Sequence, residues 1–536
     1  MRAFLALLSI ELVTSGLFMN PVVARAQSLA SSTNSNPIRH LVVIFQENVS
    51  FDHYFGTYPH AANLPGEPPF TAAAGTPSVN GLSAGLLNNN PNLNPANGAG
   101  ASNPFRLDRT QAATADQDHD YGPEQAAFHG GLMDLFPLSV GVAGPPPTSG
   151  PSIVTTPGLT MGYYDGNTVT GFWNYAQRFA MSDNSYNTTF GPSTPGAINL
   201  ISGQTNGVIN NVNGTGAIIA GGNGSYTDVS DADPVGDVCS TPTGEKFQMA
   251  GKNVGDLLNA AGVSWGFFEG GFDLTITNAN GSTGCSRSTT STVTGTKKAD
   301  YIPHHQPFQY YASTANPLHN RPSSTAAIGY TDAANHQYDS HDFFDAVKAG
   351  NYPTVSFLKA PGYQDGHAGY SDPLDEQTFI VNTINFLQQS SGDWEHTLVV
   401  IAYDDSDGWY DHQMSPILNQ SATAEDALTA PGACGTAAPA LEGSVNTLVS
   451  AQGRCGYGPR LPLLVISPWA KQNFVDHTVT DQSSILRYIE DTWLGGQRIQ
   501  GSFDSLAGPI TNMLDFTKQN PVKFILDPST GLVTGR

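Results

Sequence analysis

The sequence predicts an α/β sandwich built around a mostly parallel central sheet. Two apolar, β-prone runs, His40–Gln46 and Thr397–Tyr403, are typical of strands that are buried on both faces. Strand and helix patterns then alternate to the C-terminal end of the chain. By length, 536 residues would allow one large domain or two to four ordinary ones, and the alternation favours one domain.

The other predicted elements follow in chain order. Strands are predicted at residues 263–268, 354–358 and 463–467, and helices at residues 374–389 and 483–493. Extended surface loops rich in Gly, Asn and Pro are predicted at residues 61–115 and 140–160, and a loop insertion or cap at residues 203–240. We therefore expect a single catalytic domain over residues 27–536 that carries long loop insertions.

The N-terminus predicts a secretory signal peptide over residues 1–26. A positively charged start at Met1-Arg2 precedes a largely apolar run. Ala24-Arg25-Ala26 then fits the small-x-small pattern of a signal-peptide cleavage site. The apolar run is too short for an ordinary membrane anchor, and no later stretch is long and apolar enough to span a bilayer. The mature protein is expected to be secreted or periplasmic, without a stable membrane anchor.

The charge balance limits the partners. The chain holds 45 acidic and 22 basic residues, a formal net charge of −23, which would repel nucleic acid. A phosphate-bearing substrate would need local positive charge from a metal ion or from some of the 14 histidines. Four cysteines suit an exported protein, and we favour the sequence-local disulfides Cys239–Cys285 and Cys434–Cys455 over free thiols.

Polar pairs follow the two strongest strand patterns. Glu47-Asn48 comes directly after the first and Asp404-Asp405 directly after the second. The carboxyl ends of strands in such sheets are where ligands collect, and three carboxylates brought together there need a cation between them. A hard, oxygen-seeking metal ion is the natural candidate. Taken singly, each pair would be an ordinary polar strand end.

Ser193 is the candidate nucleophile. It lies in a turn stiffened by Gly191, Pro192 and Pro195, before residues that can begin a helix or a strand. A helix there would aim backbone N–H groups at a phosphate near the hydroxyl. A serine needs a base or a metal ion to activate it, and an isolated turn of this kind is more often structural.

Histidines recur in unusual contexts. Two are adjacent in a segment with several aromatic residues, which favours an ordered segment over a surface loop; the candidates are His119, His304, His305 and His367. Imidazoles can donate hydrogen bonds to phosphate oxygens, and one can protonate a leaving alkoxide.

Residues 47–56, ENVSFDHYFG, resemble the signature of the bacterial phosphoesterase family, which includes phosphatidylcholine-type phospholipases C and related acid phosphatases. Further stretches resemble the same family in the same order: residues 116–119 with 123–125, 191–193, 371–377, 404–408, and 456–460 leading into 466–470. The resemblance implies an alkaline-phosphatase-like, three-layer α/β/α fold. It implies that Glu47, Asn48, Asp404 and Asp405 bind one or more divalent metal ions, with Ser193 as the nucleophile at the metal.

Zinc is common among the fold relatives that the resemblance implies, so the metal is left open between Mg, Ca, Mn and Zn. Many family members have Thr where this chain has Ser193, and the serine form is closer to the acid phosphatase branch. His119, His304, His305 and His367 match that branch's active-site histidines.

The resulting hypothesis is an exported, metal-dependent acid phosphatase that hydrolyses phosphomonoesters through a phosphoserine intermediate. The alternative is a phospholipase C that cleaves phosphatidylcholine-type lipids. A binding protein is disfavoured because every matched position keeps a chemically competent residue. A sulfatase is disfavoured because no arginine follows Ser193 in the C/S-x-P-x-R spacing. The partners would be small phosphorylated substrates or phospholipid, and the oligomeric state is left open.

Overall fold

Eight strands form the central sheet of the computed structural model, which describes residues 36–141, 154–222, 224–435, 441 and 452–535. In chain order they are β1 (His40–Gln46), β4 (Ala180–Ser182), β11 (Trp265–Glu269), β14 (Gln337–Asp339), β15 (Val355–Lys359), β16 (Thr397–Tyr403), β17 (Leu463–Ile466) and β18 (Phe474–Asp476). Their order across the sheet is β14-β11-β15-β1-β16-β17-β4-β18. Among these eight, β17 alone runs against its neighbours. The sheet is therefore mostly parallel, as predicted.

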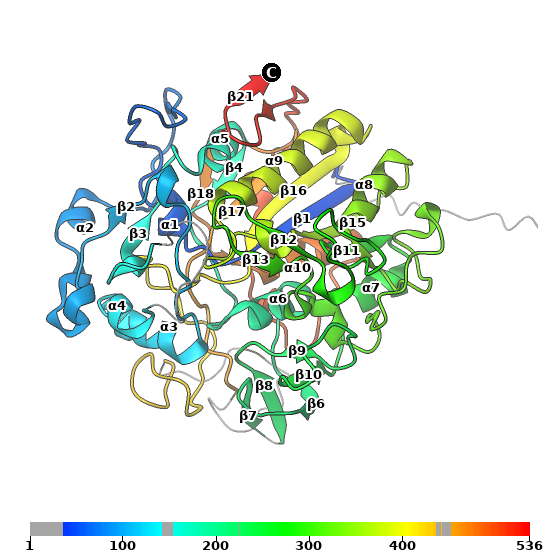
Figure 1. Ribbon diagram of the computed structural model, residues 1–536, viewed down its shortest axis with the longest axis horizontal. Coiled ribbons are helices and arrows are strands. Elements are labelled where there is room, and N and C mark those ends of the chain that lie inside the picture. Colours follow the sequence, from blue (N-terminus) through cyan, green and yellow to red (C-terminus); the bar gives the residue numbers. More distant parts are fainter. Residues whose placement is uncertain (1–35, 142–153, 223, 436–440, 442–451, 536) are drawn as a thin grey trace, which may run out of the picture. The chain divides into compact units, whose positions relative to one another are not determined.

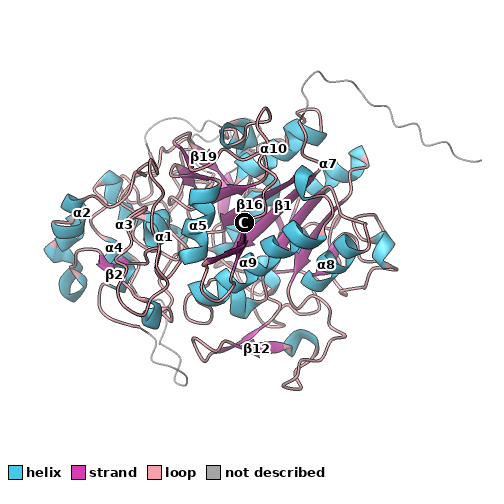
Figure 2. Cartoon of the chain, turned by 90° about the horizontal axis from the view of Figure 1, so that it is seen from above, coloured by secondary structure: helices cyan, strands magenta, loops and turns pink. Residues whose placement is uncertain are grey.

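Helices cover both faces of the sheet (Figures 1 and 2). The main ones are α5 (Thr170–Arg178), α6 (Ser193–Ser202), α7 (Val254–Ala261), α8 (Ser340–Lys348), α9 (Pro373–Ser390) and α10 (Ser483–Trp493). Helices α6, α7 and α10 pack against one another on one face, and α5, α8 and α9 lie on the other. This arrangement confirms the predicted three-layer α/β/α fold.

The two central strands pair in register along their whole length. His40 lies beside Thr397 at one end and Gln46 lies beside Tyr403 at the other, in parallel orientation. Every residue of β16 and nearly every residue of β1 is buried, as their apolar sequences require. The residues that follow the two strands, Glu47 and Asp404, therefore leave the sheet side by side.

Short helices and strands lie outside the central sheet and its main helices. The short helices are α1 (Phe51–Phe55), α2 (Ala84–Asn88), α3 (Tyr121–Phe128) and α4 (Phe136–Ser139). The short strands are β2 (Phe105–Arg106), β3 (Gly162–Tyr163), β5 (Ser185–Tyr186), β6 (Val208–Val212), β7 (Ile218–Gly222), β8 (Ser225–Asp228), β9 (Asp233–Pro234), β10 (Lys246–Met249), β12 (Ser288–Thr290), β13 (Lys297–Ala299), β19 (Thr480–Asp481), β20 (Ile525–Leu526) and β21 (Val533–Gly535).

Two of the predicted loop regions contain more regular structure than expected. Residues 61–115 include α2 and β2, and asparagine side chains cap several of their short turns, as Asn90 does for Asn92. The insertion at residues 203–240 holds β6, β7, β8 and β9, where no strand was predicted. The hairpin β7–β8 and the small sheet β6-β10-β9 satisfy the backbone hydrogen bonds of this Gly-rich segment.

Both favoured cysteine pairs are present as disulfides, Cys239–Cys285 and Cys434–Cys455. The signal peptide predicted at residues 1–26 lies outside the described residues. In the described part of the chain, no helix combines the length and the apolar character needed to cross a bilayer.

His53 makes the stability of this fold sensitive to acid. It lies buried on α1, where its Nδ1–H donates to the Gly162 carbonyl (2.8 Å) and its ring stacks on Trp409 (3.8 Å). Burial lowers the pKa of His53 to about 3. The unfolded chain takes up this proton below pH ~6.5 and the folded chain does not, so stability falls as the pH drops through this window. At pH 4 this single group should cost roughly 3 kcal/mol relative to pH 7.

His53→Asn keeps a donor for Gly162 but has no proton to take up. Between pH 7 and pH 4 its free energy of unfolding should therefore fall by roughly 3 kcal/mol less than that of the parent protein. Urea denaturation at the two pH values measures it. His60→Asn changes an exposed histidine and should leave the difference unaltered. Identical pH dependence in His53→Asn and the parent would contradict the prediction.

Candidate functional site

A buried acidic cluster lies where β1 and β16 end. It consists of Glu47, Asp404 and Asp405, whose nearest carboxylate oxygens all lie within 4.8 Å of one another. Asn48 joins it, because its backbone N–H donates to Asp404 Oδ1 (3.1 Å). Asn48 adopts a left-handed backbone conformation (φ +65°), which asparagine tolerates better than most residues and which turns the chain at this point.

Ser193 points into this cluster from the first residue of α6. Its Oγ lies 3.0 Å from Glu47 Oε2 and 3.2 Å from Asp405 Oδ2. Helix α6 reaches the end of β16 because residue 196 is glycine. A Cβ there would lie 2.2 Å from the Asp404 carbonyl oxygen, so any larger residue would push the helix away. The structure thus brings the predicted nucleophile onto the predicted metal ligands.

The donor atoms suit a hard divalent cation. Asn48 Oδ1 and Asp404 Oδ2 are buried, and within the described chain neither accepts a hydrogen bond. Burial raises the pKa of Asp404, and the charge of Glu47 raises it further. Buried oxygens of this kind are costly unless a cation binds them, and an all-oxygen set is what Mg²⁺, Ca²⁺ and Mn²⁺ prefer. The predicted ligand set therefore fits a metal ion.

Lys359 belongs to the same cluster, although sequence reasoning missed it. It is the last residue of β15, the strand on the other side of β1, and it is fully buried. Its Nζ contacts Glu47 Oε1 and lies 3.5 Å from Asp404 Oδ2. A fixed ammonium thus offsets part of the negative charge. The signal was available, since Lys359 ends a buried strand just as Gln46 and Tyr403 do.

His119 and His305 contact the cluster from opposite parts of the sequence. His119 donates from Nδ1 to the Gln117 carbonyl (2.9 Å), and its Nε2 lies 4.0 Å from Asp405 Oδ2. Burial would lower the pKa of His119, but the carboxylates of Asp405, Asp407 and Asp116 outweigh it and raise the pKa well above its usual value.

His305 is buried, with Nδ1 3.2 Å from Glu47 Oε1. Burial lowers the pKa of His305 well below its usual value despite Glu47. The surroundings of the two imidazoles thus act in opposite directions: carboxylates favour the cationic form of His119, and burial disfavours that of His305.

His304 and His367 complete the set of predicted histidines. The His304 ring lies 4.6 Å from that of His305, and its Nδ1 is 3.6 Å from Asp233 Oδ1. Burial opposes protonation of His304, but Asp231 and Asp233 raise its pKa above the usual value. His367 donates from Nδ1 to the Ala368 carbonyl (2.6 Å), and burial lowers its pKa.

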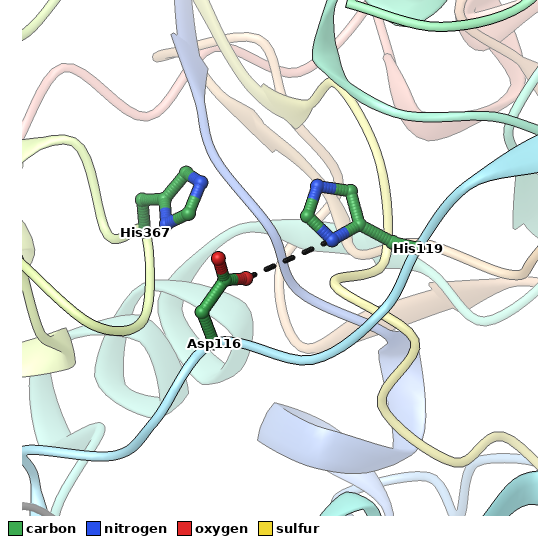
Figure 3. Close-up of side chains that lie close together, drawn as sticks. All are labelled: Asp116, His119 and His367. Carbon is green, nitrogen blue, oxygen red and sulfur yellow. Dashed lines mark ion pairs between the residues drawn. The ribbon is translucent and has the colours of Figure 1, made fainter. Parts of the chain in front are cut away.

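Figure 3 shows His367 and His119 on either side of Asp116. Their ring centroids lie 6.0 Å apart, and the Asp116–His119 ion pair measures 3.8 Å. One ligand atom from each of the three residues lies within 4.8 Å of the others, so this group also has the composition of a cation site. All four histidines therefore lie around the acidic cluster.

Two carboxylates that sequence reasoning did not assign accept hydrogen bonds from the segments that carry the site residues. Glu124 accepts hydrogen bonds from Gly191 N (3.0 Å) and Ser406 Oγ (2.7 Å), so it ties the serine turn to the loop after β16. Asp231, from the insertion, accepts from Thr194 N (2.9 Å) at the start of α6. Glu124 lies in the family-like stretch 123–125, whereas Asp231 has no recognisable motif around it.

Comparison with known proteins finds similar sequences among bacterial phospholipases C. Non-hemolytic phospholipase C of Pseudomonas aeruginosa is 24% identical over 93% of this chain, and the chain spans 60% of that protein's length. Phospholipase C B of Mycobacterium tuberculosis is 23% identical over 96% of this chain and 85% of that protein.

Among solved structures, a murine ectonucleotide pyrophosphatase/phosphodiesterase 5 has a TM-score of 0.30 at 11% identity, over 65% of this chain and 95% of that one. A Vibrio parahaemolyticus protein of the alkaline phosphatase superfamily has a TM-score of 0.26 at 11% identity, over 85% and 93%. The Phosphoesterase family matches residues 38–494, most of the chain. The chain therefore belongs to the Phosphoesterase family, as its motifs predicted.

Proposed function

We propose that this chain is an exported, metal-dependent phosphatase that hydrolyses phosphomonoesters through a phosphoserine intermediate. The observation that supports it most is the position of Ser193. Its Oγ lies within 3.2 Å of both Glu47 and Asp405 at the N-terminus of a helix, and His305 and His119 lie beside these two carboxylates.

Glu47, Asn48, Asp404 and Asp405 would hold the divalent ion together with Ser193. When bound, such an ion lowers the pKa of a hydroxyl and neutralises phosphoryl charge. Which of Mg, Ca, Mn and Zn is used would be found by elemental analysis of the purified protein.

The chain's own groups then carry the reaction. The Ser193 oxygen, at the first residue of α6, attacks phosphorus. A histidine gives its proton to the departing alcohol, and His304 suits this role because Asp231 and Asp233 favour its cationic form. Water then hydrolyses the phosphoserine ester, which releases inorganic phosphate and restores the hydroxyl. Cationic histidines favour an acidic pH for this cycle.

Phospholipase C activity is the second candidate, because the relatives named above are phospholipases C. The two functions share the chemistry at Ser193 and differ in the alcohol that leaves. Phospholipase C would release diacylglycerol and a phosphorylated head group.

Rates on p-nitrophenyl phosphate and on phosphatidylcholine vesicles, each with and without EDTA, test the proposal. We expect the phosphomonoester to be hydrolysed faster, at an acidic pH optimum. EDTA should abolish turnover, and adding back one divalent metal should restore it. Turnover of the lipid alone would favour the second candidate, and undiminished turnover after verified metal removal would contradict the metal assignment.

A further inference from the structure

Lys298 is a half-buried cation beside the histidines. It lies on β13, which pairs with β12 to form a short antiparallel ribbon (Figure 1). The ribbon packs closely on the turn after β15, because a Cβ on Gly362 would lie 2.5 Å from the Ala299 carbonyl oxygen and 3.0 Å from Lys298 Cγ. The stem of Lys298 is therefore held in place by the backbone around it.

The ammonium group of Lys298 has an aromatic partner but no counterion. Its Nζ lies 3.8 Å from the centroid of the Tyr370 ring, and the same ring stacks on His367 at 4.3 Å. Of the carboxylates in the described chain, none comes within the 4.0 Å of an ion pair with Lys298.

Its surroundings place the ammonium at the site. The Tyr370 ring under Lys298 stacks on His367, and its hydroxyl donates to Asp365 Oδ2 (3.1 Å), an oxygen that lies 3.9 Å from His305 Nδ1. The carboxylates that act on it from a distance are those of Asp365, Glu47, Asp116 and Asp231. Lys298 is thus an unpaired cation next to the histidines, on the side of the site formed by the β12–β13 ribbon.

We propose that Lys298 binds a second anionic group of the substrate, carried by the alcohol that leaves. This inference rests on the proposed phosphatase function and names its substrate class: phosphomonoesters whose alcohol part bears a further phosphate or carboxylate. The reacting phosphoryl group already has Ser193, the metal ligands and the histidines around it. An ammonium beyond them suits an anion attached to the rest of the substrate, and it would repel the quaternary ammonium of a choline head group.

Matched substrate pairs test this directly. Phenyl phosphate is compared with 4-carboxyphenyl phosphate, and fructose 6-phosphate with fructose 1,6-bisphosphate, so that the second anion is offered at a short and at a longer distance. We expect the wild-type protein to have a higher kcat/KM for the doubly anionic member of at least one pair. Lys298→Met should lower the ratio of kcat/KM between the two members of that pair roughly tenfold, mainly by raising KM for the doubly anionic substrate. Lys298→Arg should retain most of the preference.

Lys297→Met is the matched control, since Lys297 lies next to Lys298 on the same strand and is exposed. It should leave both substrates of each pair unchanged. The wild-type preference should also shrink as ionic strength rises, a test that needs no variant and holds if Lys298→Met fails to fold.

An equal loss on both members of a pair would overturn the proposal, because Lys298 would then act on the reacting phosphoryl group. A wild-type protein with no preference in either pair would also overturn it. Absence of turnover on every phosphomonoester would instead show that the proposed phosphatase function fails.

Discussion

Ser193→Ala should lower kcat on p-nitrophenyl phosphate by at least about a thousandfold, as for other covalent nucleophiles. Ser193 Oγ is the hydroxyl that lies between Glu47 and Asp405, and alanine removes it without changing the helix around it. The side chain is small and buried, so we expect little change in the free energy of unfolding. Steady-state kinetics and urea denaturation on the same preparation separate the two effects.

Ser202→Ala is a matched control on the same helix. Ser202 is also buried, but its Oγ donates to the Ile198 carbonyl at the far end of α6, so its loss should leave kcat unchanged. Acid quenching of the wild-type protein with ³²P-labelled substrate should label Ser193, and Ser193→Ala should carry no label. Wild-type turnover in Ser193→Ala, or label on another residue, would show that the nucleophile is assigned wrongly.

The long elements of the fold were predictable because their sequences are unambiguous. Strands β1 and β16 have the predicted bounds, and α9 and α10 lie within a residue of theirs. Strands β4, β14 and β18 were not predicted. Each has three residues, too few for a periodic pattern, and their strand form comes from pairing with neighbours distant in sequence.

The candidate site was predictable where a residue directly follows a buried strand. Glu47 and Asp404 meet because β1 and β16 pair in register, which no pattern within either strand specifies. Lys359 was missed although it ends a buried strand, and Asp231 was missed because it lies in an insertion with no motif around it. Their contacts depend on tertiary packing, as does the approach of Lys298 to the histidines.

Arg460→Met should destabilise the fold by about 3 to 5 kcal/mol, the usual cost of leaving buried charges without their partner. Arg460 is fully buried, with its Nε 3.1 Å from Asp411 and its Nη2 3.1 Å from Asp52. Its Nη1 donates to the Asn80 (2.7 Å) and Asp183 (2.9 Å) carbonyls. The charges of Asp411 and Asp52 outweigh burial and raise the pKa of Arg460, so it stays charged throughout the working pH range.

Methionine would fill much of the volume and leave Asp52 and Asp411 buried without this partner, so the loss should appear as a lower urea midpoint at pH 7. Arg39→Met is the matched control. Arg39 is exposed and pairs with Asp393 (3.6 Å), and an ion pair at such a position contributes about 0 to 1 kcal/mol.

The triple variant Arg460→Met, Asp52→Asn, Asp411→Asn should recover part of the stability, because the uncompensated carboxylates are then gone. Arg460→Met as stable as Arg39→Met would contradict this account. The same network joins the segment after Asn48 to the chain that enters β17, since the Arg460 guanidinium donates to Asp52 on α1 (3.1 Å). A loss of metal affinity alongside stability in Arg460→Met, measured by titration, would therefore mean that this buried guanidinium also holds the Glu47-Asn48 half of the site in place.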